Sequence, residues 1–220
     1  MAETAHLARA KPARPSHPLR AWGNAKFFES MDWYMHRRLG TRKKALFADL
    51  PALVVELGSG AGASMRYLAP GSTLVAIEPN AHAHGALRRN AERHGIDLEI
   101  REEGAESTGL ASASVDAVIC TLVLCTVDDQ AAALAEVHRI LRPGGRFVFI
   151  EHVGSGRGPL RAMQRLLRRP WRYAFDGCCL DRDTVAAIAA AGFANVQIEH
   201  FRLGGAFVPV WPQIIGVAVA

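Results

Sequence analysis

The chain has 220 residues, of which half are apolar and 21% are charged, and its formal net charge is +5. This length and composition are typical of one globular domain with a sizeable core. No apolar run reaches the roughly 18 residues of a membrane-spanning helix, so we expect no membrane span. Residues 1–20 are rich in Ala, Arg and Pro and lack the apolar core of a secretory signal. We predict a disordered lead-in there, with a transit peptide as the alternative.

Strands and helices alternate along the rest of the chain, which we predict to be a single domain over 21–220. The first expected element is a helix over 27–50, within an N-terminal lid segment, 21–50. Continuous apolar runs, typical of buried parallel strands, predict strands at 52–57, 73–77, 97–101, 115–121 and 146–151. Further helices are predicted at 62–68, 80–94, 128–141 and 181–191, and a final strand pair at 195–201 and 214–219. The alternation indicates an open, mostly parallel sheet with helices on both faces.

Local signals mark the ends of two helices. Asn80 is expected to cap the helix over 80–94 and Gly95 to end it. Asp128 is expected to cap the next helix.

Arginines cluster in a basic insertion, 154–176, which also contains Pro170. We interpret the cluster as a solvated helix face; an acidic substrate or peripheral contact with an anionic membrane surface is the alternative. No module that combines basic and aromatic residues for nucleic-acid binding is visible, so we expect no nucleic-acid partner. The sequence carries no signal for an oligomeric state.

The chain has four cysteines, Cys120, Cys125, Cys178 and Cys179. None forms a CxxC pair, and no histidine at a suitable spacing completes a zinc site, so we predict no metal site. Cys178 and Cys179 are too close for an ordinary disulfide. Reduced thiols fit a reducing compartment, and we therefore expect a cytoplasmic protein.

An apolar run that ends in an acid and then in glycines is the most informative segment. Glu56 ends the run, and Gly58, Gly60 and Gly62 follow at every second position. Because glycine has no Cβ, the backbone can turn sharply there and approach a ligand closely. The same geometry would suit a phosphate, so the glycines alone are weak support for any one ligand.

A second apolar run, 74–77, ends in another acid, Glu78. A carboxylate at this place can accept hydrogen bonds from both ribose hydroxyls of a nucleoside, so the pattern predicts a nucleoside-cofactor pocket. By spacing alone NAD stays an alternative. Glu56 argues against NAD, since an acid is unfavourable beside a diphosphate and suits the ammonium end of a methionine.

Motifs over residues 52–152 resemble those of the class I S-adenosylmethionine (SAM)-dependent methyltransferases. The segment 56–62 resembles their glycine motif, Glu78-Pro79-Asn80 their acid after the second strand, and 141–145 their turn before strand five. Gly104-Ala105-Glu106 matches their adenine-contacting segment, although an Asp is common where Gly104 stands. The resemblance implies a Rossmann-like α/β fold with a mostly parallel seven-stranded sheet, an antiparallel last strand and SAM as cofactor. It implies SAM contacts with Glu56, Gly58, Ser59, Gly60, Gly62, Glu78, Pro79, Asn80, Ala105, Glu106, Thr121 and Leu122.

A closer likeness, from about residue 53 onward, is to the mammalian microsomal alkyl-thiol methyltransferases. It rests on the segments 120–125, 149–153 and 175–178, the last preceded by Pro170-Trp171. The likeness implies methyl transfer to the sulfur of a small, apolar thiol. The mammalian enzymes carry an N-terminal membrane anchor that we do not expect here, so their localisation is not carried over.

Three side chains are candidates for the chemistry, each with a purely structural role as the alternative. His152 follows strand five at the carboxyl edge of the sheet, where ligands bind, and Asp176 lies in a loop that could fold over that edge. Either could be the base that raises the thiolate fraction, because the thiolate is the nucleophile. Tyr34 lies in the helix that related folds use as a lid. Cys125 follows strand four near the expected acceptor, and we favour a small buried hydrophobe there.

Other acceptors stay open at this point. They are an oxygen, nitrogen or carbon atom of a quinone, lipid or natural product, and arsenite held by Cys125, Cys178 and Cys179, whose spacing is unusual for that purpose. A SAM-binding regulator without turnover is the non-enzymatic alternative.

Overall fold

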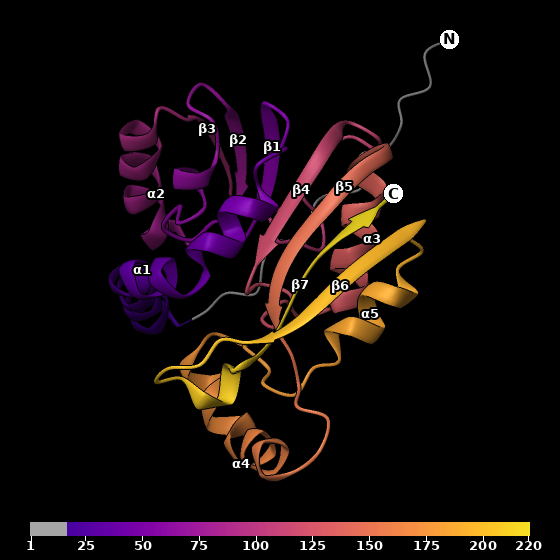
Figure 1. Ribbon diagram of the computed structural model, residues 1–220. Coiled ribbons are helices and arrows are strands. Elements are labelled where there is room, and N and C mark those ends of the chain that lie inside the picture. Colours follow the sequence, from indigo (N-terminus) through magenta and orange to yellow (C-terminus); the bar gives the residue numbers. More distant parts are fainter. Residues whose placement is uncertain (1–16) are drawn as a thin grey trace.

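Seven strands form one sheet in the order β3-β2-β1-β4-β5-β7-β6 (Figure 1). The computed structural model describes residues 17–220. Five neighbouring strands are parallel, whereas β7 lies antiparallel between β5 and β6. The predicted sheet, with its antiparallel last strand, is therefore confirmed. The strands are β1 (Leu53–Leu57), β2 (Thr73–Ile77), β3 (Asp97–Arg101), β4 (Val115–Thr121), β5 (Leu141–His152), β6 (Asn195–Arg202) and β7 (Pro212–Val219).

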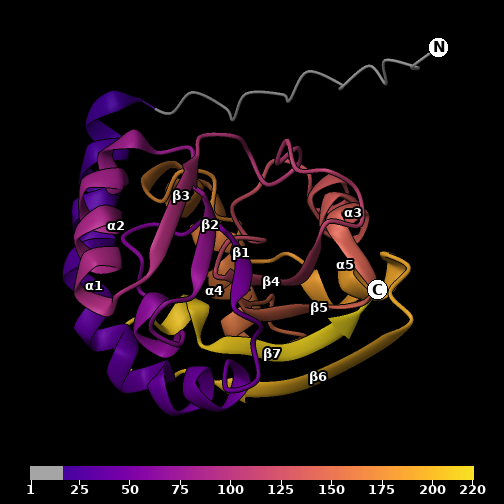
Figure 2. The same cartoon turned by 90° about the horizontal axis from the view of Figure 1, so that it is seen from above.

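Helices cover both faces of the sheet, as predicted. Figure 2 shows α1 and α2 on one side and α3 and α5 on the other, and Figure 1 shows α4 beyond the ends to which β4 and β5 point. Within the described residues, no helix combines the length and the apolar character that crossing a membrane requires. The helices are α1 (Pro18–Leu46), α2 (Ala81–His94), α3 (Gln130–Ile140), α4 (Pro159–Ala174) and α5 (Thr184–Ala190), with 3-10 turns η1 (Met65–Tyr67) and η2 (Val208–Val210).

Two apolar cores explain why the central strands are continuous apolar runs. Successive side chains of a strand point to opposite faces. Val54 packs in the core on the α2 side and Val55 in the core on the α3 and α5 side, and both are fully buried. Phe147 and Val148 of β5 divide in the same way. A sheet covered on both faces therefore leaves no polar face along these strands.

The expected end signals of α2 are confirmed. The Asn80 side chain accepts a hydrogen bond from the His82 amide, and Gly95 adopts the left-handed conformation at φ 66°. The cap of α3 was predicted one residue too early: Asp129, not Asp128, accepts from the amides of Ala131 and Ala132 at 2.9 and 3.0 Å.

Two other element predictions need correction. The helix expected over 62–68 is only the short turn η1, and Gly62, at the expected start, is left-handed with a φ of 84°. The first helix begins at Pro18, so the end of the expected lead-in, 1–20, is helical. Residues 1–16 of that lead-in lie outside the described residues. The basic insertion, 154–176, contains α4, which runs through Pro170.

Candidate active site

A cavity of about 1160 Å³ lies at the carboxyl ends of the central strands. Its walls include Gly58 and Gly60 after β1, Glu78 after β2, Leu122 after β4 and His152 at the end of β5. Ligands of open α/β sheets bind at this edge, where neighbouring strands send their connections to opposite faces. The helix α1 closes the cavity from one side through a further set of lining residues: Ala21, Asn24, Met31, Met35 and Lys43.

The three glycines after β1 have different surroundings. A Cβ on Gly58 would lie 2.4 Å from the Val123 side chain, so this glycine is required by packing within the protein. A Cβ on Gly60 would meet no atom within 4 Å, and Gly60 lines the cavity. Gly62 does not line the cavity; a Cβ there would press on the Met65 side chain at 3.0 Å. The structure therefore brings Gly58 and Gly60, but not Gly62, to the expected cofactor.

Glu78 connects the glycine loop to the start of α2. Its Oε2 accepts from the Gly60 amide at 2.7 Å and its Oε1 from the Asn80 amide at 2.8 Å. Burial raises the pKa of this carboxyl, and the two amide hydrogen bonds oppose that rise. Each oxygen keeps a second lone pair, so the side chain can still accept from hydroxyl groups in the cavity.

Glu56 is a buried residue that lines the cavity, and its Oε2 has no hydrogen-bond partner among the described residues. Burial raises the pKa of Glu56, and the charge of Lys43 on α1 opposes this. Lys43 donates to the Ser64 hydroxyl at 3.2 Å, and burial lowers its own pKa. Lys43 was not a predicted site residue, since its place in the helix pattern gives no hint that it faces an acid after β1.

The remaining predicted cofactor residues line the same cavity. The Thr121 hydroxyl is buried and has no partner among the described residues. Glu106 accepts from the amides of Asp128 and Asp129 at 2.9 and 3.3 Å and so positions the start of α3. Other cavity-lining residues of the predicted set are Ser59, Pro79, Asn80, Ala105 and Leu122.

Glu151 is a buried acid that the sequence interpretation missed as a site residue. Its Oε1 accepts from the amides of Val123 and Leu124 at 2.8 and 3.0 Å and from the Cys120 thiol at 3.3 Å. These bonds hold the loop after β4, in which Leu122 has a left-handed φ of 59°. The signal was available, because Glu151 ends an apolar strand as Glu56 and Glu78 do.

Replacing Glu151 with alanine should lower the free energy of unfolding by about 2–4 kcal/mol, since an unpaired buried amide costs about 1–3 kcal/mol. Glu151→Gln is the matched control. Its amide oxygen can still accept from Val123 and Leu124, so we expect a loss of about 1 kcal/mol or less. Urea denaturation of both variants measures the difference. Equal losses would show that these two hydrogen bonds do not set the stability of the loop.

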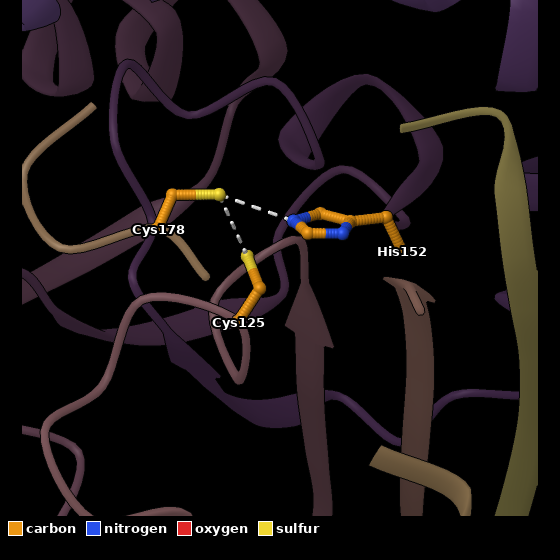
Figure 3. A group of neighbouring side chains, drawn as sticks. All are labelled: Cys125, His152 and Cys178. Atoms are coloured by element: carbon orange, nitrogen blue, oxygen red, sulfur yellow. Dashed lines mark hydrogen bonds between the residues drawn. The ribbon is translucent and has the colours of Figure 1, made fainter. Parts of the chain in front are cut away.

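His152 lies in a buried group with two cysteines (Figure 3). Its Nε2 is 3.1 Å from the Cys178 Sγ, which in turn is 3.7 Å from the Cys125 Sγ. The Trp171 indole donates to the same Cys178 sulfur at 3.3 Å. The Cys178 sulfur is thus in polar contact with three side chains, those of Cys125, His152 and Trp171.

The pKa values of this group follow from those contacts. The hydrogen bond between Cys178 and Cys125, with a further contribution from His152, holds the pKa of Cys178 well below its ordinary value. The same hydrogen bond, together with burial, raises the pKa of Cys125. Burial alone would lower the pKa of His152, but Cys178 outweighs burial and raises it. The His152 Nδ1 has no partner in the described part of the chain.

The other two catalytic candidates have different surroundings. Asp176 lines the cavity, and its two oxygens accept from Arg20 at 2.7 Å and from Asn24 at 2.9 Å. Its carboxylate therefore ties the loop after α4 to α1. Tyr34 is not among the cavity-lining residues; its hydroxyl donates to the Gly204 carbonyl at 3.5 Å and accepts from the Ala206 amide at 3.3 Å.

The residues present fit the cofactor that the sequence implied. The unpartnered Glu56 oxygen suits an ammonium group, and the free lone pairs of Glu78 suit two ribose hydroxyls. The open space beside Gly60 lets a ligand approach the backbone. When bound, SAM supplies a methyl group on a positively charged sulfur, ready for transfer.

Known proteins resemble this chain in sequence and in fold. A methyltransferase domain family matches residues 55–149. Thiol S-methyltransferase TMT1B of Homo sapiens is 35% identical over 196 residues, with 84% of this chain and 80% of the relative covered. Thiol S-methyltransferase TMT1A of Homo sapiens is 33% identical with the same coverage.

A solved SAM-dependent methyltransferase of Thermotoga maritima, described as a possible histamine N-methyltransferase, has a TM-score of 0.63 at 16% identity. That alignment covers 90% of this chain and 99% of the other, and at this identity it supports the fold alone. The sequence relatives are far closer and span most of both chains. The chain therefore belongs to the thiol S-methyltransferase family and has the fold of the SAM-dependent methyltransferases.

Proposed function

We propose that this protein transfers the methyl group of SAM to the sulfur of a small, apolar thiol. The observation that carries the proposal is a set of apolar and aromatic side chains, called the apolar wall, that line the same cavity as Cys125, His152 and Cys178. The names of the relatives that span most of the chain support a thiol as the acceptor. The wall is formed by Phe27, Phe28, Met31, Met35, Val123, Trp171, Phe175 and Phe207.

The protein side chains have separable tasks in this reaction. Glu56 and Glu78 orient the cofactor from the two sides of the glycine loop. The α1 helix, tied to the loop after α4 by Asp176, excludes water from the reacting atoms. Alignment of two reactants in a closed site can supply roughly 7–11 kcal/mol of the barrier.

The acceptor must lose its proton, because the thiolate is the nucleophile. Two candidates for this task were predicted. Asp176 already accepts from Arg20 and Asn24, so its carboxylate is engaged in holding α1. His152 lies at the apolar wall, in contact with Cys178, and we assign the acceptor sulfur to that end of the cavity.

A panel of acceptors tests the proposal. Small alkyl thiols, phenols and primary amines are incubated with the protein and SAM, and methylated products are measured by mass spectrometry. We expect turnover with the alkyl thiols, at least tenfold above that of a phenol of similar size. Methylation of a phenol or an amine, without any thiol product, would contradict the S-methyltransferase assignment and leave the SAM-dependent fold unaffected.

We propose a cytoplasmic location, which the four cysteines support. All four lie in the described part of the chain, and each is a free thiol. Contact with an anionic membrane surface remains the alternative use of the arginine-rich helix α4, on which Leu166 and Tyr173 are exposed.

A further inference from the structure

We infer that Cys125, His152 and Cys178 form a binding site for a soft divalent metal ion such as Zn²⁺, with one coordination position open to the cavity. The open position would take the sulfur of the acceptor, and this second part rests on the proposed function. The three side chains come from the loop after β4, the end of β5 and the loop after α4, and they point toward one another in Figure 3.

Two distances within the group are close to those around a tetrahedral zinc ion. Zn–S bonds of about 2.3 Å and Zn–N bonds of about 2.0–2.1 Å place two sulfurs about 3.8 Å apart and a sulfur and a nitrogen about 3.5 Å apart. The Sγ atoms of Cys125 and Cys178 are 3.7 Å apart, and the Cys178 Sγ is 3.1 Å from the His152 Nε2. All three donor atoms lie within 4.8 Å of one another. The two closest donor pairs are therefore within a few tenths of an ångström of the separations that a tetrahedral zinc ion requires.

Two cysteines and one histidine are a ligand set that catalytic zinc sites use. Structural zinc sites use four protein ligands, whereas catalytic ones use three, including the two-cysteine, one-histidine set, and leave the fourth position to water or substrate. In the described part of the chain, this group contains three donors and no carboxylate. The Trp171 indole N–H, 3.3 Å from the Cys178 sulfur, would serve as the outer hydrogen-bond donor that tunes a thiolate ligand.

The open position faces the place assigned to the acceptor. All three ligand residues line the cavity that the apolar wall also lines, and Trp171 of that wall contacts Cys178. When a thiol binds there, its S–H bond breaks, a bond between sulfur and metal forms, and the proton leaves to water. The oxidation state of the metal does not change. Coordination by a metal ion is one of the ways in which a nucleophile is activated at neutral pH.

Metal binding can be measured apart from activity. The full chain is kept reduced, stripped with a chelator and titrated with Zn²⁺ by calorimetry and with Co²⁺ by absorption spectroscopy. We expect one ion per chain and, for Co²⁺, a thiolate-to-metal charge-transfer band. Cys178→Ser and Cys125→Ser should each weaken binding by on the order of a hundredfold or more, since even changes to outer partners cost 10–100-fold.

Cys179→Ser is the matched control. Cys179 is adjacent to Cys178, but its thiol donates to the Gly177 carbonyl at 3.3 Å and is not in the group. This variant should bind Zn²⁺ as the wild type does. Circular dichroism checks that the variants fold. The titration of the wild type tests for a metal site even if a variant does not fold. The absence of stoichiometric binding by the wild type, or full binding by Cys178→Ser, would overturn the metal site.

The open position is tested with 1-propanethiol on the Co²⁺-loaded protein, with 1-propanol as the control. The thiol should shift the charge-transfer band and the alcohol should not. An unchanged spectrum would overturn the assignment of the acceptor to the metal. If metal-free protein methylates propanethiol at the full rate, the catalytic use of the metal is wrong and the S-methyltransferase assignment stands. If Zn²⁺ binds but no thiol in the panel is methylated, the proposed function fails and the metal site stands.

Discussion

Gly60→Val should abolish SAM binding in calorimetry while the protein remains folded. A Cβ at this position would enter open cavity space, so the larger side chain would occupy the volume that the cofactor needs. Gly60 also has a φ of 53°, where a side chain costs about 1–2 kcal/mol. The expected result is therefore a modest loss of stability together with a complete loss of binding.

Gly71→Val separates these two effects. Gly71 is exposed, has a φ of 83° and has no atom within 4 Å of its ideal Cβ position, but it does not line the cavity. The control should lose a similar amount of stability and bind SAM normally. If Gly60→Val binds SAM as well as the Gly71 variant does, the glycine loop does not contact the cofactor.

Glu78→Ala should weaken SAM binding at least tenfold. Hydrogen bonds to a charged group contribute about 1.5–3 kcal/mol each, and tenfold in affinity corresponds to about 1.4 kcal/mol. The variant would lose both ribose acceptors, and it would also leave the amides of Gly60 and Asn80 without their partner. Calorimetric titration with SAM measures the change.

Glu99→Ala is a suitable control for the loss of one negative charge. Glu99 lies on the edge strand β3, is exposed and pairs with Arg101 at 2.7 Å. SAM should bind this variant as it binds the wild type. An equal affinity of the Glu78 and Glu99 variants would remove Glu78 from the cofactor site.

Helix ends and strand ends could be predicted from the sequence, because they depend on residues that are close together in the chain. Asn80 and Gly95 mark the ends of α2, because a cap needs only the amides or carbonyls of one turn. The acids Glu56 and Glu78 could be placed at one sheet edge, because parallel strands of a doubly wound sheet end together. The sequence could not tell which of two adjacent aspartates, Asp128 or Asp129, caps α3, because either side chain can cap a helix start. The choice involves a distant residue, since Glu106 accepts hydrogen bonds from the amides of both.

Contacts between distant segments could not be predicted in this way. Cys125, His152 and Cys178 lie far apart in the chain, so no spacing rule for metal ligands applies to them. They meet only because β4 and β5 are neighbours and the loop after α4 returns over their ends. Lys43 faces Glu56, and Asp176 faces Arg20, for the same kind of reason.

The position of α1 has a consequence for how the molecule assembles. Arg20 and Asn24 of α1 form hydrogen bonds with Asp176, which lies 156 and 152 residues further along the chain. Tyr34 of α1 forms one with Gly204, which lies 170 residues further along. Contacts of such long range close large loops and form late, whereas the strand pairs β1–β2 and β2–β3 are local. We therefore expect the β3-β2-β1 part of the sheet to form before the first helix settles against its partners. The earliest segment of the described chain to be synthesised would then reach its final place late.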